Sequence, residues 1–81
     1  MEESKVHKFT YKDIAEALVK QQGIHEGIWG VYVEFGIAAS NIGQTPQDML
    51  PAAIVPVVSI GIQTFPEENN LTVDAAKVNP A

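Results

Sequence analysis

The spacing of hydrophobic residues changes near Gly27, from a helical period to a period of two. Before that point, apolar residues recur every three or four positions, as on the inner face of an amphipathic helix. These residues are Tyr11, Ile14, Ala15 and Leu18. Thr10 and Asp13 have the spacing of a capping box, and Gly23 can supply the left-handed residue that ends a helix. The sequence therefore predicts a helix over residues 11–22.

Beyond Gly27, two long stretches alternate in the manner of β-strands. In residues 28–39 the apolar side chains occupy the odd positions Trp29, Val31, Val33, Phe35, Ile37 and Ala39. In residues 52–65 they occupy the even positions Ile54, Val58, Ile60 and Ile62. Pro56 lacks a backbone donor, which indicates a sheet edge or a bulge at that point. We expect two long antiparallel strands, with the odd face of the first strand in the core.

The remaining segments carry weaker signals. The connection over residues 40–51 suggests one helical turn that follows Thr45 and ends at Pro51. Residues 71–73 alternate like a short third strand, although residues 73–77 could also form a helical turn. Residues 1–8 and 79–81 have the character of flexible ends. The whole chain, 1–81, is interpreted as a single α+β domain.

The chain is small, and this affects how it can be stabilised. A domain of 81 residues buries only about 60–65% of the surface that its unfolded chain exposes. It contains no cysteine, so neither a disulfide nor a cysteine metal site can add stability. Between Gly27 and Phe65 the only charged residues are Glu34 and Asp48. We therefore expect this middle stretch to be more buried than its flanks, and the sheet to be completed or covered by homo-oligomerisation.

The charge balance excludes some classes of partner. The net charge is -5, with 5 basic residues, all lysine, against 10 acidic residues. Binding of nucleic acid normally requires a basic face, so no nucleic-acid partner is expected. No uninterrupted apolar stretch reaches the ~18–20 residues of a membrane-spanning helix, so no membrane partner is expected either. The N-terminal sequence lacks the apolar region of a secretory signal, and a cytoplasmic location is expected by default.

Candidate chemistry centres on Glu34, the only charge within the long strands. Tyr32 lies two residues away on the same strand face. Trp29 lies on the odd face and could line a pocket for an apolar ligand. A carboxylate beside a phenol could bind a small ligand or act as a base if partly buried. An ordinary half-exposed strand face would have the same pattern. Tyr32, Glu34 and Trp29 are therefore the candidate ligand-binding residues.

Other constellations are weaker. His25 and Glu26 have no second histidine at helical spacing, which favours a hydrogen-bonded corner over a metal site. The glycines near residue 27 precede a strand, whereas a phosphate-binding loop opens a helix. No nucleophile motif of a triad hydrolase is recognisable. No cofactor, metal or catalytic residue is assigned.

Three functional hypotheses follow from the sequence. The first is a small self-associating structural or interaction module, because the apolar surplus of the strands needs cover. The second is an oligomer that binds a small ligand near Tyr32 and Glu34. The third is a small enzyme that uses the same two residues. The first requires the fewest assumptions, so a catalytic role is not expected.

Overall fold

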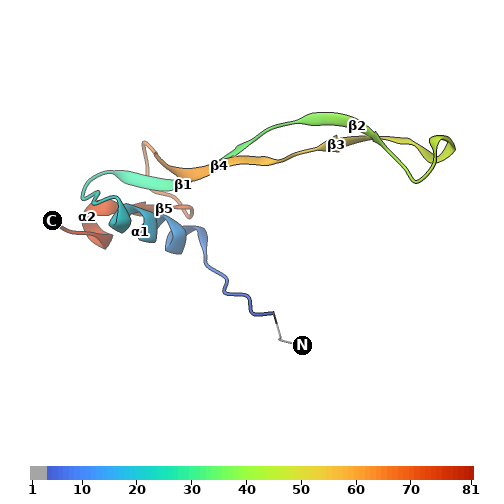
Figure 1. The fold of residues 1–81 in the computed structure, drawn as a ribbon. Coiled ribbons are helices and arrows are strands. Elements are labelled where there is room, and N and C mark those ends of the chain that lie inside the picture. The colour runs from blue at the N-terminus through green and yellow to red at the C-terminus, as the bar shows by residue number, and fades with distance from the viewer. Residues whose placement is uncertain (1–3) are drawn as a thin grey trace.

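The N-terminal helix α1 (Tyr11–Gln21) begins and ends close to where the sequence predicts. This computed structural model describes residues 4–81 (Figure 1). The Thr10 hydroxyl accepts a hydrogen bond from the Asp13 amide, and the Asp13 carboxylate accepts one from the Thr10 amide, both at 3.1 Å. At the other end, Gly23 has a φ of 67° and Ile24 donates its amide hydrogen to the Val19 carbonyl, as in a Schellman ending.

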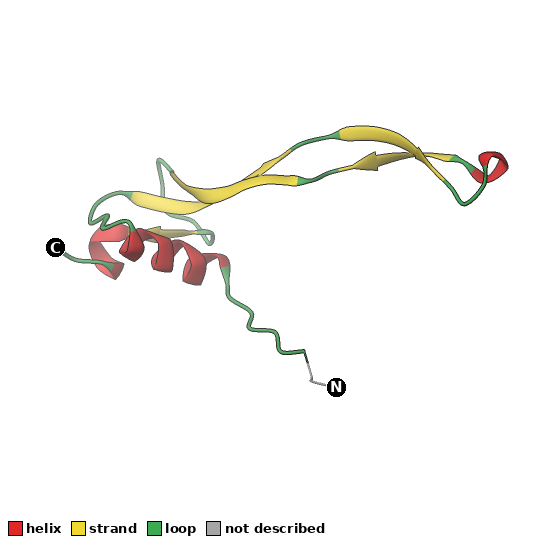
Figure 2. Ribbon diagram, viewed as in Figure 1, coloured by secondary structure: helices red, strands yellow, loops and turns green. Residues whose placement is uncertain are grey.

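A long antiparallel hairpin follows the helix. Its inner ladder joins β1 (Ile28–Phe35) to β4 (Val57–Thr64), and its outer ladder joins β2 (Ala38–Ile42) to β3 (Leu50–Ile54). The short 3₁₀ helix η1 (Pro46–Asp48) lies in the loop at the tip. Figure 2 shows that both ladders extend in one direction away from the helices.

The chain returns to β1 after the hairpin. Strand β5 (Thr72–Asp74) pairs antiparallel with Ile28–Gly30 of β1 on the side opposite β4, giving the order β4-β1-β5. Helix α2 (Ala75–Val78) continues directly from β5. Both outcomes that the sequence allows for this segment therefore occur in succession, first a strand and then a helical turn.

The hydrophobic core is confined to the region where α1 covers β1 and β5. Its buried members are Ala15, Val19, Val73 and Ala75, and partly buried apolar side chains packed against it are Ile24, Trp29, Val31, Ile62 and Val78. We call this region, with α1, α2, β5 and the inner halves of β1 and β4, the body. The outer hairpin, residues 34–59, is called the arm.

The arm and the projecting residues 4–10 give the molecule an extended shape (Figure 1). The Cα radius of gyration is 18.9 Å, whereas a compact chain of 81 residues has one of about 12 Å. The principal extents are 61 × 40 × 21 Å. In Figure 1, α1 and α2 lie near the inner part of the hairpin, and no helix packs along the arm. The arm thus has its strands paired with each other but no second layer within the described residues.

The structure corrects two expectations about the strands. Strands are more numerous than predicted, because each long stretch is interrupted, near Gly36 in one and near Pro56 in the other. The odd face of the first stretch is only partly core. Trp29 and Val31 are half-buried under α1, but Phe35 is 59% exposed and Ile37 83% exposed. The physical reason is length: α1 covers the inner part of the hairpin, and the arm projects beyond it.

The chain ends differ in how much the structure describes. The expected flexible segment 1–8 falls partly outside the described residues. At the other end, Asn79 makes two contacts with the turn after α1: its side-chain Nδ2 donates to the Ile24 carbonyl at 2.9 Å, and its backbone carbonyl oxygen lies 2.7 Å from His25 Nδ1. The corner at His25 is thus hydrogen-bonded to the C-terminal segment.

Candidate functional site

Two of the three candidate residues from the sequence share a strand face, and the third does not. Tyr32 and Glu34 lie on the face of β1 that points away from α1, and the Ser59 hydroxyl donates to the Glu34 carboxylate at 2.9 Å. Trp29 lies on the opposite face, packed against the core. Its indole nitrogen donates to the Glu26 carbonyl at 2.9 Å, which fixes the ring at the corner before β1.

The face that carries Glu34 is open and flat. Glu34, Tyr32 and Ser59 are all exposed. Their cross-strand neighbours are small or polar, since Tyr32 pairs with Gly61 and Glu34 pairs with Ser59. The carboxylate therefore has a hydroxyl partner and surrounding water but no enclosing wall. This arrangement can present a polar surface, and it supplies no cavity for a ligand.

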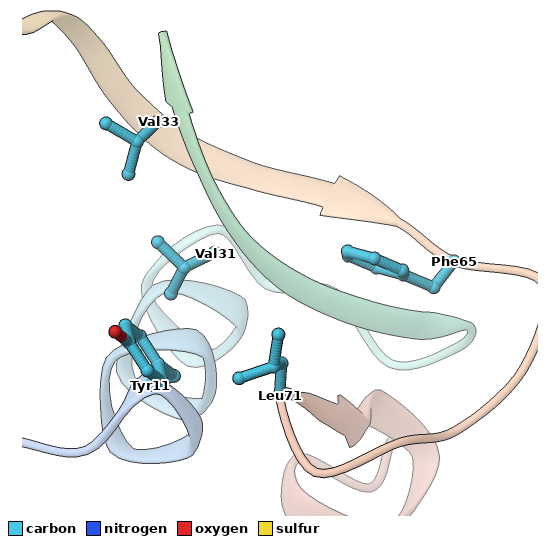
Figure 3. A pocket seen from close by; sticks show the side chains of 5 residues that line it. All are labelled: Tyr11, Val31, Val33, Phe65 and Leu71. Carbon is cyan, nitrogen blue, oxygen red and sulfur yellow. The ribbon is translucent and has the colours of Figure 1, made fainter. Parts of the chain in front are cut away.

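A hollow lies instead at the outer edge of β1, on the side of β5. Its volume is about 330 Å³, and its lining residues are Tyr11, Val31, Val33, Phe65 and Leu71. In Figure 3, Tyr11, Val31, Val33 and Leu71 gather on one side of β1, and Phe65 lies across the strand from them. Apart from the Tyr11 hydroxyl, the lining side chains are apolar. The hollow is suited to receive an apolar side chain rather than to carry out acid–base chemistry.

The hollow forms because β5 separates from β1 after only a short ladder. A turn at Asn69 draws the chain away, since the Thr72 amide donates to the Asn69 carbonyl and the Asn69 amide donates to the Thr72 hydroxyl. The pairing between the strands therefore stops at Gly30 opposite Thr72. From Val31 onward, this edge of β1 has no neighbouring strand within residues 4–81.

The free edge has a definite set of backbone groups. The Ile28 carbonyl accepts from the Phe65 amide on the β4 side, and the Gly27 carbonyl accepts from the Ala75 amide on the β5 side. Because successive residues of a strand point their N–H and C=O groups to alternate sides, odd-numbered residues of β1 face the β5 side. Val31, Val33 and Phe35 thus present their backbone donors and acceptors along the free edge.

The arm exposes apolar side chains on both of its faces. On the α1 side, Phe35 pairs with Val57 next to Val33 and Ile60. In the outer ladder, Ile42 pairs with Leu50 and Ala38 with Ile54, and by strand alternation these pairs lie on the other face. The large apolar side chains exposed along the arm are Phe35, Ile37, Ile42, Met49, Leu50, Ile54, Val55, Val57 and Val58. Only Glu34 and Asp48 carry charge there.

The sequence does not identify the residues of the hollow as a group. Tyr11 is predicted to lie on the inner helix face, and Val31 and Val33 to lie in the core. Phe65 and Leu71 stand at the ends of predicted strands, and no spacing rule places them together. The missing signal is the turn at Asn69, whose side chain accepts a hydrogen bond from the Leu71 amide at 2.7 Å. An Asn two residues before an apolar position is consistent with such a turn, but it does not predict which edge the turn exposes.

Comparison of this chain with protein-family models, with curated proteins and with solved structures finds no significant match. No helix of the described residues is both long and apolar enough to cross a membrane. The functional argument therefore depends on the geometry of the arm, the free edge of β1 and the hollow.

Proposed function

We propose that this chain is a self-associating interaction module, in which the arm and the neighbouring edge of β1 are covered by another copy of the same chain. The observation that carries the proposal is the surplus of exposed surface. The accessible area is 6705 Å² for a chain of 8.8 kDa. A compact monomer of that mass would expose about 4,800 Å².

The surplus of about 1,900 Å² per chain, which the arm shares with the exposed residues 4–10, has the size of a protein interface. A standard interface removes about 800 Å² from each partner, and obligate homodimers remove more than that. An obligate interface also has the composition of a divided core, rich in apolar side chains. The arm has this composition, with aliphatic and aromatic residues on both faces and two charged residues along its length.

Energetics support the same proposal. Full burial of a Val, Ile or Phe side chain contributes roughly 1.5–3 kcal/mol, while the net stability of a small domain is about 5–15 kcal/mol. Among residues 4–81 the buried core contains only four apolar residues, all alanine or valine: Ala15 and Val19 in α1, Val73 in β5 and Ala75 in α2. Covering the arm would therefore add stability that the small core lacks, and it would protect exposed strand edges from uncontrolled pairing.

Ligand binding near Tyr32 and Glu34 receives less support. Those two side chains lie on an open face, and the third candidate, Trp29, lies on the opposite one. The hollow beside β1 is apolar and is lined by none of the three. It is better matched to a side chain of a protein partner than to a polar metabolite.

The proposal is tested by placing a charge on the apolar face of the arm. Val57 is 52% exposed and pairs with Phe35, so Val57→Asp should reduce the assembled mass or unfold the chain, because a buried unpaired charge is costly. Gln63→Asp is the matched control, since Gln63 is already polar and exposed on the same strand. Sedimentation velocity at equal concentrations compares them. If Val57→Asp sediments as wild type does, the arm is not part of an interface.

A further inference from the structure

The free edge of β1 has the length and the backbone donors and acceptors needed to pair with the same edge of a second chain. It begins at Val31, because β5 occupies the edge up to Gly30, and it ends at Phe35, where β1 ends before the bend at Gly36. The midpoint of this free segment is Val33. An antiparallel partner strand centred on Val33 would fill the whole segment and would meet neither β5 nor the bend.

We propose that two copies associate through this edge, with β1 pairing antiparallel to the partner's β1 about a two-fold axis at Val33. The inference depends on the proposed self-association and specifies one part of its surface, the edge of β1, together with the register there. In this register, Val33 lies opposite the partner's Val33, and Val31 lies opposite the partner's Phe35. These are the odd-numbered residues whose backbone groups already point to the free edge, so each forms the hydrogen-bonded type of antiparallel pair.

The register places Phe35 of each copy at the hollow of the other. Phe35 shares the α1 side of the strand with Val31 and Val33 by alternation. A side chain opposite Val31 on that face lies beside Tyr11 and Leu71, which form the wall of the hollow. The ring of the partner's Phe35 therefore enters an apolar space of about 330 Å³ that the single chain leaves unfilled (Figure 3). In the single chain this ring is 59% exposed.

The opposite face supports the same register. Tyr32 lies opposite the partner's Glu34, and Glu34 lies opposite the partner's Tyr32, so a phenol and a carboxylate meet across each non-hydrogen-bonded pair. A register shifted to centre on Glu34 would place two carboxylates directly opposite each other, which is unfavourable.

The resulting sheet has a consistent arrangement of layers. The sheet order becomes β4-β1 followed by the partner's β1-β4, and each β5 lies on the same edge of its own β1 as the partner's strand, beyond the end of the paired segment. A two-fold axis perpendicular to the sheet places both α1 helices on the same face. The register requires each arm to bend out of this sheet at Gly36, because β5 of the other copy occupies the edge from Gly30 inward. The interface is isologous and closed, so it does not propagate into a fibre.

Single-cysteine variants test the register, because the chain contains no cysteine of its own. Opposed residues of a non-hydrogen-bonded antiparallel pair have Cα atoms about 4.5 Å apart, which lies within the range of roughly 4.4–6.8 Å for a disulfide. Tyr32→Cys and Glu34→Cys are unfolded together, refolded as a mixture and oxidised. The expected result on a non-reducing gel is a covalent dimer in the mixture and none from either variant alone.

The controls separate the register from self-association. A mixture of Tyr32→Cys with Ser59→Cys should give no covalent dimer, because Ser59 lies on the same face but one strand further from the axis. A covalent dimer from either variant alone would overturn the register, since it requires residue 32 or residue 34 to oppose itself. No covalent dimer in any mixture, with dimer mass retained in light scattering, would overturn the β1 interface but leave self-association standing. A monomer mass would overturn both.

Discussion

Replacement of Phe35 by alanine should weaken dimerisation far more than it weakens the fold of a single chain. A fully buried Phe side chain removes roughly 200 Å² from water, and Phe35 has 59% of its surface exposed before association. Roughly 100 Å² per ring is therefore available for burial in the partner's hollow. At about 25 cal/mol per Å² this amounts to about 2.5 kcal/mol, of which alanine retains a small part.

The two-fold axis doubles this effect, since each dimer contains two such rings. A loss of about 2 kcal/mol per ring gives about 4 kcal/mol per dimer, and about 1.4 kcal/mol corresponds to a tenfold change in the dissociation constant. Phe35→Ala should therefore raise the dimer dissociation constant by several hundredfold. Sedimentation equilibrium over a range of concentrations measures this constant directly.

Ile37→Ala is the matched control for this experiment. Ile37 is 83% exposed, more than Phe35, and it lies just beyond Gly36 in the break between β1 and β2. If association depended only on exposed apolar area, Ile37→Ala would weaken the dimer at least as much. The β1 register instead places Ile37 outside the paired segment, so a small change is expected. Equal effects of the two substitutions would refute the reasoning.

Two further predictions concern the body. Thr10→Ala should lower the free energy of unfolding by about 1 kcal/mol, since the Asp13 amide loses its acceptor; an unchanged denaturant midpoint at equal concentration would contradict this. Gly23→Val should destabilise more than Gly23→Asn, because the φ of 67° is a left-handed conformation that Asn tolerates and a β-branched residue resists. A Cβ at Gly23 would meet no atom within 4 Å, so the difference reflects backbone strain alone. Thermal melts of the two variants that coincide would show that Gly23 is not strained.

The helix was predictable because its signals are local. Thr10, Asp13 and Gly23 act within a few residues of the positions that they cap, and the structure confirms the capping box and the left-handed ending. Antiparallel pairing of the two apolar stretches was also predictable from their alternation. Which residues lie opposite one another, such as Val31 and Ile62, was not predicted, and the register shifts between Glu34 and Phe35.

The burial of the strands was not predictable from their pattern. Alternation assigns Val31 and Phe35 to the same face, but it contains no information on where a covering helix ends. α1 is 11 residues long, which corresponds to about 17 Å at 1.5 Å per residue, and this is shorter than the hairpin that it lies against. Val31 is therefore half-buried and Phe35 exposed, although their sequence signals are alike.

The candidate site shows the same limit. Glu34 was a candidate because it is the only charged residue in the predicted strands. In the structure its carboxylate accepts a hydrogen bond from the Ser59 hydroxyl on an open face. The hollow arose from a turn at Asn69 that ends the β5 ladder early, and this is a tertiary consequence of a local hydrogen bond. Tyr11 and Leu71 lie far apart in the chain and meet there because α1 packs against both β1 and β5.

Self-association is tested most directly by the mass of the unmodified chain in solution. Light scattering coupled to size exclusion, over a dilution series in the micromolar range, gives that mass without any substitution. We expect twice the chain mass of 8.8 kDa at the higher concentrations, with dissociation only on strong dilution. A mass of 8.8 kDa at every concentration, with the chain folded, would contradict the proposal that another copy covers the arm.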